Sequence, residues 1–353
     1  DLRESSTASD MSLVAEITYT QEPLRKVLSQ ILLYYTLIGF IAVVMGIAMA
    51  YVIARFLTTP ITEILEDVST IAEGDLGHTI RSMPNPEFRR LEESINMMIG
   101  KIQQFSQEIE REKAEIRIAA EIQRTFLPKA IPESARFEIA AMNIPAQEVG
   151  GDFYDFISLN EQSLGLVIAD VAGKGIPAAL FMALSRSILR AIATADQRVE
   201  ETIEESNSLI AADGAAGMFV TLFYCILDRY TGEASYVNAG HNPPLHYSRR
   251  ENRLRTLLPT GMAMGVMPDL SYSVGRFSLD AEDVLVLYTD GVTEAFNKNG
   301  EVFGEERLIN AVCASRDMSA GEILDTIFRQ VTEFTGGAMQ SDDITLVIIR
   351  GRK

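Results

Sequence analysis

Histidine and cysteine are scarce in this sequence, which contains three histidines and two cysteines among 353 residues. Cys225 and Cys313 stand far apart and form no C-x-x-C pair, the spacing typical of zinc and redox motifs. Zinc sites in proteins depend mainly on these two residue types. The composition therefore disfavours a zinc site, and we expect both cysteines to be reduced thiols.

Basic residues are also outnumbered by acidic residues. The chain has 31 Lys and Arg against 49 Asp and Glu, a formal net charge of −18. A nucleic-acid groove needs a basic face that neutralises phosphates. We therefore expect no nucleic-acid partner, whereas an acidic protein suits divalent cations.

Charged residues are absent between Lys26 and Arg55. Residues 31–53 within this gap are almost wholly apolar, and a helix needs about 20 such residues to cross a bilayer. No small-residue cleavage site follows, which disfavours a signal peptide. We expect a transmembrane helix over residues 30–54, in contact with membrane lipid. Because the chain begins at Asp1 rather than Met, we also expect a further part upstream.

The segment after the apolar run has two amphipathic halves joined by a Gly-Asp-Leu connector (74–76). In the second half, apolar residues recur at alternating steps of three and four from Phe88 to Ile109. Such a seam implies a partner helix. With Pro60 and Asn96, the segment resembles a HAMP module over residues 55–107. The resemblance implies a parallel four-helix bundle formed by two chains on the cytoplasmic side of the membrane; a plain helical hairpin is the alternative.

Two further segments flank this relay. The seam continues into a charged helix that Pro128 ends, and we interpret residues 108–127 as a signalling linker. Residues 1–29 faintly resemble the end of an extracytoplasmic Cache-type sensor. The regulatory positions expected in the linker are Glu121, Ile122, Phe126 and Leu127.

From residue 137 onward, short β-rich runs appear, interrupted by three helical stretches at 177–194, 199–211 and 318–334. Strands and helices do not alternate regularly, which disfavours a doubly wound parallel sheet. An α+β domain with mainly antiparallel sheets fits residues 128–353 better.

Acidic residues stand where apolar runs meet loops. Asp170 ends LGLVIAD, Asp290 ends VLVLYTD, the pair Asp342-Asp343 precedes ITLVIIR, and Asp152 follows Gly-Gly in a turn. Strand ends hold side chains rigidly while loops leave room for a ligand. A single Asp at such a place is usually a turn former. Four such places in one domain indicate an acidic cluster.

Clustered carboxylate oxygens select Mg²⁺ or Mn²⁺. Two such ions can lower the pKa of a bridging water and neutralise a phosphoryl group under in-line attack. The cluster therefore predicts phosphoester hydrolysis without a protein nucleophile. Lys174 and Gly175, at the opening of a predicted helix, are weaker candidates for binding phosphate. They do not form a Walker loop, because its spacing is absent.

Seven runs, taken in order, resemble the PPM-type metal-dependent serine/threonine phosphatases of the RsbU/SpoIIE-like branch. They are AAEIQRTFLP (119–128), VGGDFYDF (149–156), IADVAGKGIPAALFM (168–182), TLFYCILD (221–228), NAGHNPP (238–244), LYTDGVTEA (287–295) and SDDITLVIIR (341–350). The resemblance implies an antiparallel β-sandwich flanked by helices. A Gly-Gly-Asp turn is also typical of diguanylate cyclases, but these have no counterpart to LYTDG and SDDITL.

The resemblance also implies roles at a site with two Mn²⁺ or Mg²⁺ ions. Asp170 would bridge the ions, Asp152 would bind the first and Asp290 the second. The implied ligands are Asp152, Asp170, the carbonyl of Val171, Asp290, Asp342 and, as a weaker candidate, Asp343.

Two roles stay open. Eukaryotic members have an Asp-Gly-His-Gly run whose His is a candidate general acid, whereas this chain has Asp-Val-Ala-Gly from Asp170. His241 is either a general acid or a structural turn residue. Asp155 is either structural or linked to the site through water.

The implied function is that of a membrane-bound receptor phosphatase. Its sensor would lie outside the cell, its phosphatase domain in the cytoplasm, and its HAMP and linker helices would form a homodimer in the inner or plasma membrane. The implied substrate is phosphoserine or phosphothreonine on a small anti-sigma-factor antagonist. Two alternatives are a catalytically inactive pseudophosphatase that binds and releases a partner, and a nucleotide cyclase.

Overall fold

The computed structural model describes residues 22–81, 83, 85–195, 198–213 and 217–353. The chain divides into two compact units, Asp1–Glu110 and Arg111–Lys353, and each is described by itself. Most of the predicted sensor remnant, residues 1–21, lies outside the described residues.

The first unit begins with a long apolar helix. Helix α1 (Glu22–Ile53) continues through a π-helical turn, η1 (Ala54–Thr58), into α2 (Thr59–Ala72). Pro60 lacks the N–H of an α-helical bond, and the Thr59 hydroxyl donates to the Ala54 carbonyl at 3.0 Å. The stretch Glu22–Ala72 contains a window with mean hydropathy 2.6 and no buried residue, so it is long and apolar enough to cross a membrane.

A polar network fixes the connector between α2 and α3 (Pro86–Phe126). The buried Asp67 of α2 is hydrogen-bonded to the His78 ring at 2.8 Å and accepts the Arg81 N–H at 3.2 Å. The side chain of Asn96 on α3 accepts the Ile80 N–H at 2.9 Å. The connector is therefore held by side chains from both flanking helices, which suits the predicted two-helix relay.

In its described residues, the second unit contains two sheets and five helices after α3. Its elements are β1 (Phe137–Ile144), β2 (Phe153–Ser158), β3 (Ser163–Val171), α4 (Gly175–Ala193), α5 (Val199–Asp213), β4 (Val220–Asp228), β5 (Glu233–Ala239), β6 (Leu245–Ser248), β7 (Arg253–Thr256), β8 (Gly275–Ser278), β9 (Val284–Tyr288), α6 (Asp290–Thr293), α7 (Gly304–Ser315), α8 (Ala320–Thr335) and β10 (Ile344–Gly351). The sheet orders are β1-β10-β9-β6-β7 and β2-β3-β4-β5-β8. The named strands pair antiparallel throughout, which confirms the predicted α+β fold class.

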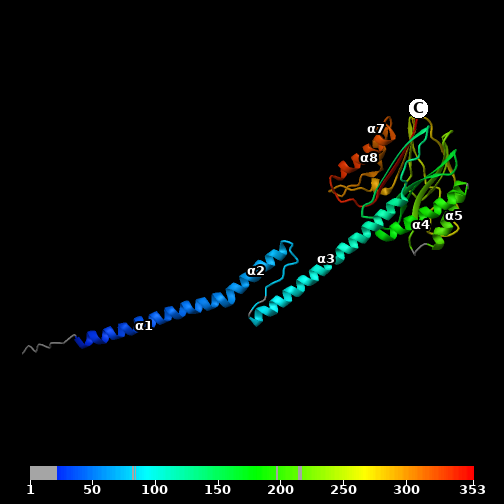
Figure 1. The fold of residues 1–353 in the computed structure, drawn as a ribbon. Coiled ribbons are helices and arrows are strands. Elements are labelled where there is room, and N and C mark those ends of the chain that lie inside the picture. The colour runs from blue at the N-terminus through cyan, green and yellow to red at the C-terminus, as the bar shows by residue number, and fades with distance from the viewer. Residues whose placement is uncertain (1–21, 82, 84, 196–197, 214–216) are drawn as a thin grey trace, which may run out of the picture. The chain divides into compact units, whose positions relative to one another are not determined.

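The two sheets pack face to face with helices outside. Leu166 of β3, Leu287 of β9 and Val347 of β10 belong to one core between the sheets. A second core joins α4 and α5 to the sheet that contains β3, and a third joins α7 and α8 to the sheet that contains β9. Figure 1 shows the two helix pairs on opposite sides of the sheets. The unit is thus a four-layered sandwich.

Strand alternation decides which side chains face the sandwich interior. Asp170 continues the interior row of β3 after Leu166 and Ile168. Asp152 extends the row of interior side chains of β2, and Asp343 extends that of β10. One end of an otherwise hydrophobic interior is therefore acidic.

Most elements follow the sequence pattern. The predicted helices at 177–194, 199–211 and 318–334 correspond to α4, α5 and α8, and the linker helix ends at Phe126 as expected. The pattern missed β2, whose Asp155 interrupts the apolar run, and the helix α7. It also missed β6, β7 and β8, which have four residues each and give little alternation to detect.

Asp155 is a structural residue. Alternation turns it away from the interior and toward α4, where it is 1% exposed. Its Oδ2 pairs with Arg190 at 2.7 Å and with Arg186 at 2.9 Å. The structural alternative for Asp155 is therefore favoured, because both carboxylate oxygens contact arginine.

We expect Asp155→Ala to lower the free energy of unfolding of residues 108–353 by about 3 kcal/mol, because it leaves Arg186 without its buried partner. Urea denaturation followed by circular dichroism measures this. Asp325→Ala, at an exposed position of α8, is the control and should change stability by less than about 0.5 kcal/mol. Equal effects of the two substitutions would contradict a structural role for the ion pair.

Candidate active site

Asp152 lies buried just before β2, with 4% of its surface exposed. Its Oδ2 accepts a hydrogen bond from the Thr345 hydroxyl at 2.7 Å, and that hydroxyl accepts one from the Asn143 side chain at 2.8 Å. Burial, followed by the charges of Asp170 and Asp343, raises the pKa of Asp152 well above its usual value. Ionised Asp152 is therefore costly unless a cation lies nearby.

Asp170 and Asp290 are perturbed in the same direction. Burial raises the pKa of Asp170 to about 7, and the charges of Asp290 and Asp342 add to this. Burial raises the pKa of Asp290, the first residue of α6, to about 6, with Asp342 as the next cause. The structure thus brings Asp152, Asp170, Asp290 and Asp342 into one electrostatically linked cluster.

Asp342 sits at the more open side of this cluster. Its Oδ2 forms an ion pair with Lys174 Nζ at 2.9 Å, and the same ammonium donates to the Ser341 carbonyl at 2.5 Å. Lys174 therefore already neutralises a carboxylate. Its role in binding phosphate stays a prediction, as does that of Gly175, which opens α4 with φ of 70°.

Asp343 is engaged differently from its neighbour. Its carboxylate accepts hydrogen bonds from the backbone amides of Ala146 (2.8 Å), Gly151 (2.7 Å) and Asp152 (3.3 Å). A Cβ on Gly150 would lie 2.2 Å from Asp343 Oδ2, which explains why glycine precedes Gly151. With its oxygens so used, Asp343 is better suited to holding the β1–β2 loop than to binding a metal.

The Val171 carbonyl approaches the same loop. A Cβ on Gly151 would lie 2.9 Å from the Val171 oxygen, so the second glycine allows β3 and the loop to come close. This contact places the carbonyl beside the turn that leads into Asp152. The Gly-Gly-Asp sequence is therefore a consequence of two close approaches at one turn.

His241 lies behind Asp170. Its Nδ1 is 2.9 Å from the Thr221 hydroxyl, and Thr221 is the β4 partner of Asp170. The ring is 2% exposed, and Nε2 has no hydrogen-bond partner among the described residues. Burial lowers the pKa of His241 to about 4. A buried neutral ring that supports the strand beside Asp170 favours the structural alternative over the general acid.

The donor set suits hard divalent cations. The cluster supplies carboxylate and carbonyl oxygens, which Mg²⁺ and Mn²⁺ prefer, and its raised pKa values reflect a burial cost and repulsion that bound cations would relieve. In the part of the chain that the structure describes, no three His, Cys, Asp or Glu side chains already converge at metal-binding spacing. The residues therefore fit the ions in charge and donor type.

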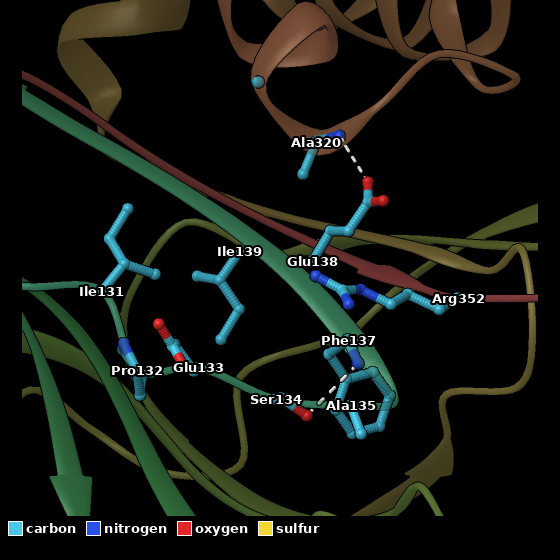
Figure 2. Close-up of a pocket in the computed structure, with 11 residues that line it drawn as sticks. Ile131, Pro132, Glu133, Ser134, Ala135, Phe137, Glu138, Ile139, Ala320 and Arg352 are labelled. Atoms are coloured by element: carbon cyan, nitrogen blue, oxygen red, sulfur yellow. Dashed lines mark hydrogen bonds between the residues drawn. The ribbon is translucent and has the colours of Figure 1, made fainter.

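A large cavity lies away from the acidic cluster. It has a volume of about 770 Å³ and is lined by residues 131–135, the start of β1 and the start of α8. Figure 2 shows Glu138 on its wall, bonded to the Ala320 amide at 3.3 Å. No residue of the acidic cluster lines it, so chemistry rather than cavity size identifies the site.

Sequence reasoning missed the residues that support the cluster. Thr289 accepts the Thr345 N–H at 3.0 Å, and Thr345 together with Asn143 orients Asp152. Gln123, which the sequence placed only in the helical seam, donates to the Gly150 carbonyl at 2.6 Å and accepts its N–H at 3.2 Å. The sequence signal that could have found two of these supporting residues is the threonine of T-D-G, Thr289, and the threonine of D-D-I-T, Thr345. Each lies beside an acidic turn.

Comparisons with known proteins agree with this geometry. A family model described as Stage II sporulation protein E (SpoIIE) matches residues 160–352, and a HAMP domain model matches residues 52–104. Protein IcfG of Synechocystis sp. is 31% identical over 88% of this chain and 55% of its own length. Phosphoserine phosphatase RsbU of Bacillus subtilis is 30% identical over 81% of this chain and 86% of its own.

The solved SiaA-PP2C domain of Pseudomonas aeruginosa has the same fold. Its TM-score is 0.61 with 21% identity, over 69% of this chain and 98% of that chain. The double antiparallel sandwich with an acidic end has the fold of PPM-type phosphatase domains. Within this class, the chain belongs to the SpoIIE family, and it carries a HAMP domain upstream. It spans 55% of the length of IcfG.

The pKa shifts predict that Asp170→Asn stabilises the metal-free domain. The folded-state pKa of about 7 exceeds the unfolded value of about 3.9. Ionisation of Asp170 therefore removes stability as the pH rises from about 4 through 7. In EDTA at about pH 8, the melting temperature of residues 108–353 should rise by a few degrees, and the gain should disappear near about pH 4.

Asp343→Asn is the matched control and should act in the opposite direction. An amide cannot accept the three backbone N–H groups as well as a carboxylate does, so the melting temperature should fall. Destabilisation of the metal-free domain by Asp170→Asn would contradict the proposed repulsion.

Proposed function

We propose that this chain is a signal-regulated protein serine/threonine phosphatase that uses two Mn²⁺ or Mg²⁺ ions. The observation that carries the proposal is the cluster of Asp152, Asp170, Asp290 and Asp342, whose burial and mutual repulsion raise three pKa values. Such a cluster is useful to a protein that binds cations and costs stability in one that does not. The feature therefore favours an enzyme over a pseudophosphatase.

The carboxylates of the cluster have two tasks in this proposal. Asp152, Asp170 and Asp290, with the carbonyl of Val171, would hold the two ions. When bound, the ions supply positive charge for the phosphoryl group and activate a water for in-line attack. Asp342 lies at the more exposed side of the cluster, and its ion pair with Lys174 places an ammonium group there.

The buried network determines how Asp152 is presented. Thr345 donates to Asp152 Oδ2 and so leaves its other oxygen for a cation. Asp343 fixes the Asp152 backbone through the adjoining amides. Thr345 lies in β10 and Asp343 just before it, so residues from the opposite sheet position Asp152, which lies just before β2.

The substrate class follows from the family. RsbU is named a phosphoserine phosphatase, and this chain is 30% identical to it over most of both lengths. We assign phosphoserine or phosphothreonine on a protein as the substrate, with a small anti-sigma-factor antagonist as the partner that the family resemblance supports.

Metal-dependent hydrolysis tests this assignment. Residues 108–353 should release para-nitrophenol from its phosphate ester with Mn²⁺ and not in EDTA. Asp290→Asn should lower kcat by at least about 100-fold, because the second ion loses its charged ligand. Asp325→Asn, at an exposed position of α8, is the control and should keep full activity.

Absence of turnover in the fragment calls for the full chain in lipid with a phosphoserine protein. Absence of metal-dependent turnover there as well would leave the pseudophosphatase as the better assignment.

The linker helix provides a route for regulation. Gln123 of α3 clamps both polar groups of the Gly150 backbone, two residues before Asp152. A cavity of about 270 Å³ is lined by Gln123 and Leu127 on one side and by Asp152 on the other. Of the predicted regulatory positions, Leu127 packs against the α4 core and Phe126 is half-buried, whereas Glu121 and Ile122 are exposed. A shift of this helix would act directly on the Asp152 turn.

Membrane attachment and dimerisation complete the proposal. The exposed apolar stretch of α1 and the HAMP match support membrane attachment. We place the HAMP domain and the phosphatase on the cytoplasmic side as part of the proposal. The HAMP seam is also exposed: Met98 is 60% and Phe105 63% accessible. A second copy of the seam would cover these side chains.

Gln123→Ala tests the route through the linker. Loss of two hydrogen bonds to Gly150 should free the turn and lower kcat/KM of the full chain in lipid by roughly 10-fold. Arg117→Ala, at an exposed position of the same helix, should have no effect. Unchanged activity of Gln123→Ala would show that the linker does not act through this contact.

A further inference from the structure

A small apolar cavity adjoins the acidic cluster on the side of Asp290 and Asp342. It has a volume of about 240 Å³, and Gly291 and Ser341 line it, each next in sequence to one of those aspartates. The cavity therefore lies beside the chain turns that carry Asp290 and Asp342. None of the roles assigned above uses it.

The walls of this cavity are mainly hydrocarbon. Phe328 and Val331 of α8 form one wall, and Phe296 after α6 forms part of another. Phe296 and Met339 are 38% and 87% exposed at the rim. Exposed apolar side chains around a hollow are typical of a surface that another molecule covers.

The loop that carries Met339 is held in place. Gly336 ends α8 in the left-handed region with φ of 56°, and Gly337 follows with φ of 79°, which lets the chain reverse. Gln340 then donates to the carbonyls of Ile144 (2.9 Å) and Asp342 (2.8 Å). The rim is thus tied by hydrogen bonds to the same turn as the acidic site.

We propose that this cavity binds an apolar side chain of the phosphorylated substrate, close in sequence to the phosphoserine. The proposal rests on the proposed phosphatase function and adds a determinant of specificity. A cavity of about 150 Å³ lined by similar side chains holds benzene, so a Leu, Met or Phe side chain fits here. An extended chain advances about 3.3–3.6 Å per residue, and the cavity shares the turns of Asp290 and Asp342, so we expect the recognised residue near the phosphoserine in sequence.

A set of phosphopeptides tests the proposal on the full chain in lipid with Mn²⁺. The host peptide contains one phosphoserine among Gly and Ser residues, and Leu is placed singly at each of the four positions on either side. Released phosphate gives kcat/KM. Burial of one Leu side chain should raise kcat/KM by at least about 10-fold at one position over the host.

Two variants locate the effect. Ala338→Leu fills the cavity and should abolish the advantage of the favoured peptide, and Met339→Gln, on the exposed rim, should reduce it without disturbing the core. Ala314→Leu and Met318→Gln, which do not line the cavity, are the matched controls and should keep the preference.

The outcomes separate failure of the apolar subsite from failure of the phosphatase assignment. Metal-dependent hydrolysis of all peptides with equal kcat/KM, or a preference that persists in Ala338→Leu, overturns the apolar subsite and leaves the phosphatase assignment intact. Absence of metal-dependent hydrolysis with every peptide and with para-nitrophenyl phosphate overturns the phosphatase assignment, and the subsite with it.

Discussion

The carboxylate of Asp343 is the contact on which the site depends. It stands at the head of β10 in one sheet and holds the loop that leads into β2 of the other through three backbone amides. Charge-assisted bonds of this kind contribute about 1.5–3 kcal/mol each. A side chain at position 150 would clash with the Asp343 carboxylate, and the hydrogen bonds of that carboxylate place Asp152. Gln123 contacts the same loop from the linker helix. A structural anion thus organises carboxylates that repel one another.

The fold was largely predictable because its central strands are strongly patterned. The runs that became β3, β9 and β10 are long, apolar and followed or preceded by aspartate, which fixed both the strands and the acidic end of the interior. The four-residue strands near the sheet edges were missed since too few residues alternate to show a period of two. Strand β2 was missed because its outward Asp155 pairs with arginines that lie more than 30 residues later.

The sequence predicts which aspartates gather at the site, but it says less about how they are arranged and what each one contacts. Adjacent Asp342 and Asp343 look equivalent in sequence, yet alternation sends one to Lys174 and the other to the β1–β2 loop. The contact of Asp152 with Thr345 joins residues 193 positions apart, and no local pattern encodes such a pairing. His241 illustrates the same limit, because only the structure shows that its ring is buried behind β4.

Strand β10 lies between β1 and β9, although it is the last strand in chain order. During synthesis, β1 therefore cannot pair with β10 until nearly every other element has left the ribosome. The loop that Asp343 anchors lacks its hydrogen bonds to Asp343 for the same interval. Pairings of such high sequence separation form slowly. The acidic end of the interior can therefore be completed only after β10, the last strand, has been synthesised.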